Sequence, residues 1–181
     1  MPPVVALLAL IVLGLLGLLA LPRKARGLTP IATPGPMDPG AVIAPAPKWP
    51  YEAEIRAAAG RYGVDPDLVA AVIAWETRGR FNADATNPAD PSYGLGQVTP
   101  YIAVRFGIIA SAVDYRELYD PEKNTRAVAA FLDYLLNEKK YPLDMAIQMY
   151  NEGEPNYWEG CRVISYLNGV MDYYDKYRVG G

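Results

Sequence analysis

Glu76 occupies a position where a residue facing the protein core is expected. It lies in the stretch LVAAVIAWETRGRFN (68–82), three residues after Ile73 and seven after Val69, on one stripe of a helix. Burial at the end of this stripe would raise the pKa of the carboxyl, and a helix C-terminus also disfavours an anion. A carboxylic acid that stays protonated near neutral pH can act as a general acid on a glycosidic oxygen.

A less specific interpretation competes with this one. A glutamate at the end of a helix can turn to solvent or pair with a nearby cation, here Arg78 or Arg80. The composition limits the other chemistries, because the chain has no histidine and Cys161 is its single cysteine. Ser-His and Cys-His nucleophiles, His-ligated zinc and Cys-rich metal sites are therefore excluded, and we expect neither metal nor cofactor.

The elements that would hold Glu76 are helical. Proline follows a capping residue at Asp65, Thr99 and Asp120, which favours a helix start at each place. Further helices are expected at these ranges: 51–63, from about residue 143, and 162–177. No segment alternates convincingly as a strand would, so the sequence predicts a compact all-α domain over residues 51–181.

The first 50 residues have a different character. Residues 4–21 are all apolar or glycine and are long enough to just span a bilayer. We expect a retained transmembrane anchor over residues 1–26 with its basic flank, and a cleaved signal peptide is the alternative. Residues 27–50 include seven prolines and predict an extended, semi-rigid linker. From Tyr51 onward 13 basic and 19 acidic residues give a formal charge of −6, which disfavours nucleic-acid binding. The 14 tyrosines suit a groove that stacks on sugars.

Four motifs occur in a fixed order over about residues 52–177. They are WETRGRFN with the following YGLGQVTP, then YDPEKNTRAVAAFLDYLL, then AIQMYNEGEPN, and finally VISYLNGVMDYYDKY. This set resembles the lytic transglycosylase family with the goose-type lysozyme-like (SLT) fold. The resemblance implies the same fold and cleavage of the bond between N-acetylmuramic acid and N-acetylglucosamine in peptidoglycan, with a 1,6-anhydro product.

The resemblance also implies roles for the matched positions. Glu76 would be the catalytic acid and then the base. The substrate-binding residues would be Thr77, Ser92, Tyr93, Gln97, Tyr150 and Asn151. For Ser92 and Tyr93, packing within the loop and turn is an equally weighted alternative.

Three departures from the family pattern matter. Thr77 replaces serine but keeps the hydroxyl, and Gly96 replaces a larger residue, which predicts more room beside Gln97. Glu152 replaces alanine and is a candidate second acid. The candidates for a base that activates water are Asp84, Asp90 and Glu117. A hydrolytic muramidase therefore stays open, as does a non-catalytic wall-binding structural virion protein.

The basic cluster at residues 23–26 follows the apolar span, whereas a bacterial periplasmic enzyme would normally carry positive charge before it. This order favours a phage protein that acts in entry or lysis. The expected partners are peptidoglycan strands and, through residues 4–21, a lipid membrane. The expected location is a single-pass anchor in a phage virion membrane or in the host inner membrane, facing the periplasm.

Overall fold

The computed structural model describes residues 46–179. Both the expected anchor and most of the expected linker lie outside these residues. Within them, no helix combines the length and apolar character that crossing a membrane requires. The elements are α1 (Glu52–Tyr62), α2 (Pro66–Glu76), β1 (Thr86–Asn87), β2 (Ser92–Tyr93), α3 (Pro100–Arg105), the 3₁₀ segment η1 (Ala112–Tyr119), α4 (Pro121–Asp133), the π-helical turn η2 (Tyr134–Glu138), α5 (Leu143–Glu152), α6 (Glu154–Trp158) and α7 (Ile164–Val179).

The three predicted caps are confirmed. The side chains of Asp65, Thr99 and Asp120 accept hydrogen bonds from the first turns of α2, α3 and α4, and proline stands at the first turn each time. These bonds pair backbone N–H groups that a helix start leaves free. The first turns therefore fix where the helices of the site begin.

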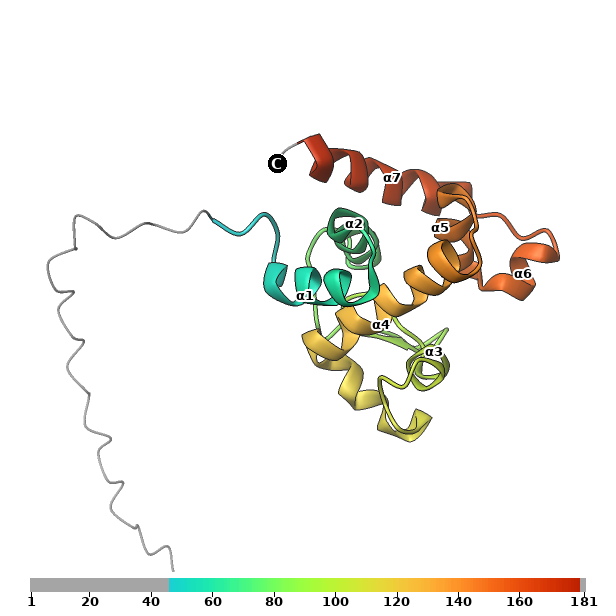
Figure 1. The fold of residues 1–181 in the computed structure, drawn as a ribbon. Helices are drawn as coiled ribbons and strands as arrows, with labels where there is room; N and C mark the ends of the chain where they lie inside the picture. Colours follow the sequence, from blue (N-terminus) through green and yellow to red (C-terminus); the bar gives the residue numbers. More distant parts are fainter. Residues whose placement is uncertain (1–45, 180–181) are drawn as a thin grey trace, which may run out of the picture. The chain divides into compact units, whose positions relative to one another are not determined.

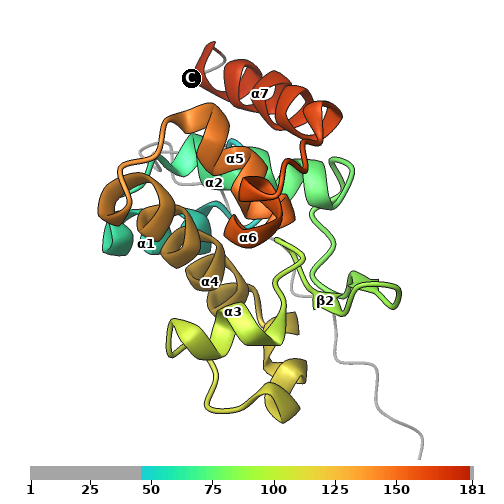
Figure 2. The same cartoon turned by 90° about the vertical axis from the view of Figure 1, so that its right-hand side faces the viewer.

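Helix α2 lies at the centre of the domain. Figure 1 shows it between α7 on one side and α1 and α4 on the other, and Figure 2 shows the same order from a second direction. All residues from Leu68 to Ala74 are buried, so the helix is covered on every face. The predicted single apolar stripe was too narrow a description, because a helix that is apolar all round packs in the interior.

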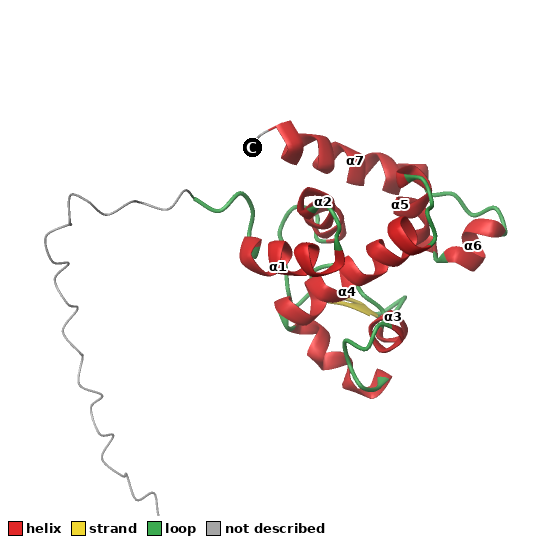
Figure 3. Ribbon diagram, in the orientation of Figure 1, coloured by secondary structure: helices red, strands yellow, loops and turns green. Residues whose placement is uncertain are grey.

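The all-α prediction needs one small correction. Two antiparallel strands of two residues each, β1 and β2, pair Thr86 with Tyr93 and Asn87 with Ser92 (Figure 3). They close the loop that carries Asp90. Strands this short show no alternation in sequence, which is why the pattern did not reveal them.

The packed part of the chain begins before Tyr51. The Trp49 side chain is 3% exposed, and its ring lies 5.5 Å from that of Tyr177 in α7. Lys48 forms an ion pair of 2.9 Å with Asp67 near the start of α2. The end of the expected linker is therefore fixed against the domain.

Candidate active site

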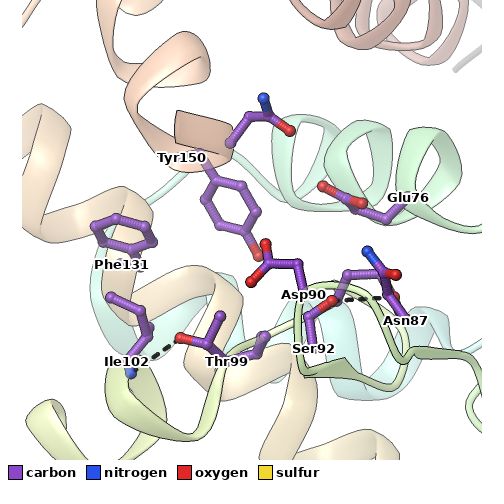
Figure 4. A pocket seen from close by; sticks show the side chains of 11 residues that line it. Glu76, Asn87, Asp90, Ser92, Thr99, Ile102, Phe131 and Tyr150 are labelled. Carbon is purple, nitrogen blue, oxygen red and sulfur yellow. Dashed lines mark hydrogen bonds between the residues drawn. The ribbon is translucent and has the colours of Figure 1, made fainter. Parts of the chain in front are cut away.

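The carboxyl of Glu76 leaves the C-terminal end of α2 and lines a small cavity of about 130 Å³. Figure 4 shows it pointing into the space that Tyr150, Asp90 and Asn87 also border. None of the ion pairs within residues 46–179 involves Glu76, so the expected alternative of pairing with Arg78 or Arg80 is not what the structure shows.

Burial raises the pKa of Glu76 from 4.5 to about 7. The hydroxyl of Tyr166, in α7, donates a hydrogen bond of 2.7 Å to Glu76 Oε1 and opposes this shift. A donor to the carboxylate stabilises its charged form, whereas burial destabilises it. The direction that the sequence predicted for this pKa is confirmed, and the carboxyl is partly protonated near neutral pH.

Four further predicted site residues line the cavity with Glu76: Ser92, Gln97, Tyr150 and Asn151. Ser92 Oγ donates to Gln97 Oε1 at 3.2 Å, and Gln97 Nε2 donates to the carbonyl of Gly94 at 2.9 Å. These two bonds hold the amide of Gln97 against its own turn. The wall of the cavity is thus rich in amide and hydroxyl groups, which suits hydrogen bonding to the hydroxyls of a sugar.

The turn that carries Gln97 is fixed by one buried side chain. Asn124, in α4, accepts from the backbone N–H of Gly96 at 2.7 Å and donates to the carbonyls of Tyr93 and Leu118. Gly94 has φ of 73°, and a Cβ there would lie 2.2 Å from the carbonyl oxygen of Leu118. Only glycine fits this place, so the Gly-Leu-Gly-Gln turn is set by its backbone.

The expected extra room beside Gln97 is absent. A Cβ on Gly96 would lie 2.1 Å from Val128 Cγ2 and 3.0 Å from the hydroxyl of Tyr150. Tyr150 donates to the Gly96 carbonyl at 2.9 Å, and its ring lies 5.3 Å from that of Phe131. The space that a larger residue would need is therefore filled by α4 and by Tyr150.

Two predicted substrate contacts lie elsewhere. The hydroxyl of Thr77 donates to the Ile73 carbonyl at 2.7 Å and accepts from the Phe81 N–H at 2.9 Å, so it shapes the end of α2. The ring of Tyr93 packs against Tyr115 at 4.7 Å. Neither side chain lines the cavity of Glu76.

The candidates for a second carboxylate lie at different places relative to the cavity of Glu76. Asp90 lines the same cavity as Glu76, whereas Glu152 lines the neighbouring one. Glu117 pairs with Lys123, and Asp84 lines neither of the two. Asp90 is therefore the carboxylate that the structure brings to Glu76.

Sequence reasoning did not give Tyr166, Asn87 or Phe131 a place at the site. Tyr166 lies within the predicted helix 162–177, and 90 residues separate it from its partner Glu76. Phe131 lies in α4, the helix whose start at Asp120 was predicted. No local pattern identifies such contacts, because they depend on how α7 and α4 pack against α2.

Comparisons with known proteins agree with this architecture. The family model for the transglycosylase SLT domain matches residues 53–162, more than half of the chain. Among solved structures, an inactive mutant of the lytic transglycosylase Slt from Pseudomonas aeruginosa superposes with a TM-score of 0.57 at 22% identity. The match covers 71% of this chain and 24% of that one, so this chain spans about a quarter of the length of Slt.

The helical arrangement around a partly buried glutamate defines a lysozyme-like domain. The chain belongs to the transglycosylase SLT domain family. The resemblance that the four sequence motifs predicted is thereby confirmed.

Proposed function

We propose that this protein is a lytic transglycosylase that cleaves peptidoglycan between N-acetylmuramic acid and N-acetylglucosamine. The observation that carries the proposal is Glu76, a carboxyl with a pKa of about 7 on the wall of a polar cavity. Membership of the SLT family supports the same conclusion.

In the proposed reaction protonated Glu76 donates its proton to the bridging oxygen, and the bond from this oxygen to the muramic C1 breaks. The Glu76 carboxylate then takes the proton of the muramic C6 hydroxyl while O6 bonds to C1. The acid is regenerated, a 1,6-anhydro ring closes and no water is consumed. The N-acetyl group of the substrate supports the positive charge at C1, so a second carboxylate is not needed.

The groups around the cavity would position the sugar. Asn151 and Gln97 offer amide groups, and Ser92 offers a hydroxyl. Burial, and then the charge of Glu76, raise the pKa of Tyr150 well above its usual value, so its hydroxyl stays neutral. These groups bind neutral hydroxyl and amide functions without competing for the proton of Glu76.

Asp90 supports a second candidate, a hydrolytic muramidase. Its exposed carboxylate borders the same cavity and would activate a water molecule on the face of the sugar opposite Glu76. In that case the products would carry reducing muramic ends.

The cellular setting is part of the proposal. The apolar residues 4–21 would anchor the protein in a membrane, and the proline-rich residues 27–50 would hold the domain away from its surface. The basic residues after the span favour a phage enzyme that acts in entry or lysis, in a virion membrane or in the host inner membrane facing the periplasm.

The test is digestion of purified peptidoglycan by the full chain, with Glu76→Gln as control and mass spectrometry of the products. Products that are one water lighter and carry 1,6-anhydromuramic acid support the transglycosylase. Reducing muramic ends would replace it with the muramidase, and Asp90→Asn would be the next variant. Folded protein without products would leave a wall-binding or structural role.

A further inference from the structure

The hairpin formed by β1 and β2 is one wall of the cavity that Glu76 lines. Asn87 of β1 and Asp90 of the connecting loop both border this cavity (Figure 4). Figure 2 shows the hairpin at the edge of the helical domain. A two-stranded hairpin is only marginally stable by itself in water. The position of this wall therefore depends on the contacts that hold the hairpin from outside.

The second strand, β2, is held on several sides. The backbone of Tyr93 exchanges two hydrogen bonds with that of Val98, at 3.0 and 3.1 Å. The Tyr93 carbonyl also accepts from Asn124 Nδ2 at 2.8 Å, and the Tyr93 ring packs against Tyr115 of η1 at 4.7 Å. The other residue of the strand, Ser92, is buried. These contacts fix β2 to the domain.

The first strand, β1, is the exposed one, and both of its residues, Thr86 and Asn87, face solvent. Within residues 46–179, one side-chain hydrogen bond joins β1 to an element outside the hairpin. It links the hydroxyls of Thr86 and of Tyr119, the last residue of η1, which lie 2.8 Å apart. This bond therefore ties the exposed strand to the rest of the domain.

The ring of Tyr119 is itself held in place. It lies edge-on against the ring of Tyr93, with the ring centres 5.9 Å apart. The cap Asp120 and helix α4 follow Tyr119 directly in the chain. A side chain that packing already orders loses little further freedom when it forms a hydrogen bond. Tyr119 is thus a fixed point to which the hydroxyl of Thr86 can bind.

Asn87 connects this bond to the cavity. Successive side chains of a strand point to opposite faces. Thr86 binds Tyr119 on one face, and the next residue, Asn87, borders the cavity. Asn87 Oδ1 accepts from the N–H of Ala89 at 3.2 Å, which holds the side chain within the hairpin. A displacement of Thr86 would therefore move the Asn87 amide relative to Glu76.

We infer that Tyr119 is a positioning residue for substrate binding, because its hydroxyl, through Thr86, holds the hairpin against a glycan strand bound at Glu76. The inference rests on the proposed function, since it requires a peptidoglycan strand in this cavity. Tyr119 does not border the cavity, so its effect reaches the substrate only through the hairpin. Glu76 and its partner Tyr166 belong to α2 and α7, and loss of the bond leaves the acid in place.

The test measures kcat and KM of the full chain separately, on soluble glycan strands without cross-links. Tyr119→Phe and Thr86→Val each remove one of the two hydroxyls and nearly retain the size of the side chain, and the double variant removes both. Thr86→Ser keeps the hydroxyl and is the conservative replacement. Tyr115→Phe is the matched control, because the contact of Tyr115 with the hairpin is ring packing, which phenylalanine retains. Thermal unfolding checks that each variant is folded.

We expect Tyr119→Phe and Thr86→Val each to raise KM by about five-fold, the size of one hydrogen bond between neutral groups, and to leave kcat unchanged. The double variant should raise KM no further than either single one, because the bond is already lost. Thr86→Ser and Tyr115→Phe should retain the KM of the wild type.

Three results would overturn the inference. They are an unchanged KM in Tyr119→Phe, whatever its melting temperature; effects of the two single variants that add up in the double variant; and an equal rise of KM in Tyr115→Phe. A folded wild type that cleaves no strand would instead contradict the proposed function itself.

Discussion

The carboxyl of Glu76 connects activity to stability through its pKa. Between pH 4.5, its ordinary pKa, and about 7, its pKa in the fold, the unfolded chain has lost this proton and the folded chain retains it. The unfolded state binds fewer protons, so this group reduces stability as pH rises, and the loss levels off above about pH 8. The full effect is on the order of 3 kcal/mol.

The variant Glu76→Gln should therefore lose activity and gain stability at alkaline pH. Without the acid, cleavage should fall on the order of 10³-fold. The melting temperature should match the wild type near pH 4.5 and exceed it at pH 8. Glu138→Gln is the control, because Glu138 is exposed and should change neither quantity. Equal melting curves for wild type and Glu76→Gln across this range would show that Glu76 is not destabilised by burial.

Tyr166 should affect how the activity of the enzyme depends on pH. Its hydroxyl stabilises the charged form of Glu76, so Tyr166→Phe should raise the pKa of the acid. The pH at which kcat/KM falls on the alkaline side of its profile should increase by roughly one pH unit. The ring, packed edge-on against Trp75 at 6.2 Å, is retained in phenylalanine.

A matched variant separates this effect from loss of packing. Tyr174, on the same helix, donates to Asp65 Oδ2 at 2.7 Å, away from Glu76. Tyr174→Phe should reduce stability slightly and leave the pH profile where it is. A profile that shifts equally in both variants would remove the specific role of Tyr166.

At this scale the sequence predicted a raised pKa for Glu76, and the family resemblance gave Ser92 and Gln97 as substrate-binding residues, which line the same cavity as Glu76. Thr77 was predicted to contact substrate, but its hydroxyl satisfies backbone groups at the end of α2. A hydroxyl directly after a helix has these local partners within reach, and spacing alone does not distinguish the two uses.

At the scale of elements, the close contact of α7 with α2 depends on Gly169. A Cβ at this position would lie 2.0 Å from Trp75, whose ring occupies that space. Since Tyr166 is on the same helix, the contact also brings its hydroxyl to Glu76. The position of one small residue in α7 therefore controls the geometry of the acid.

Gly169→Ala should consequently destabilise the protein by about 1–3 kcal/mol and lower activity, because α7 must move away from Trp75. Gly60→Ala in α1 is the matched control. A Cβ there meets nothing within 4 Å, so alanine should be neutral or stabilise the helix by up to about 1 kcal/mol. Chemical denaturation measures both, and similar free energies of unfolding for the two variants would contradict the packing argument.

Helix starts were predictable because a capping residue followed by proline is a local signal. The starts of α2, α3 and α4 follow it. The segments η1 and α6 carry no comparable periodicity over their eight and five residues, and the sequence did not indicate them. Yet α6 supplies Trp158 to the cavity that adjoins the one lined by Glu76. The parts that sequence patterns miss are thus short segments at the edge of the site.

At the scale of the whole molecule, Trp49 determines where the folded unit begins. Its ring packs on Tyr177 and lies beneath the cations of Lys48 and Arg56, at 5.0 and 5.3 Å from its centre. The proline pattern suggested that the linker continues to Pro50, because proline content reports local stiffness and not tertiary contact. A single buried aromatic residue at the end of such a segment fixes it to the domain.

Trp49→Ala should therefore cost about 3 kcal/mol of unfolding free energy, the lower end for a buried tryptophan, since the chain end can move to reduce the cavity. Trp49→Phe should restore most of the loss, because an aromatic ring can still pack on Tyr177. Trp158→Ala is the control, an exposed tryptophan whose removal should cost less than about 1 kcal/mol. Denaturant unfolding measures the free energy of unfolding of the three variants. If Trp49→Ala and Trp158→Ala lose equally little of it, the burial of Trp49 does not stabilise the fold. If Trp49→Ala alone is costly, the contact of Trp49 with Tyr177 of α7 contributes to the stability of the fold.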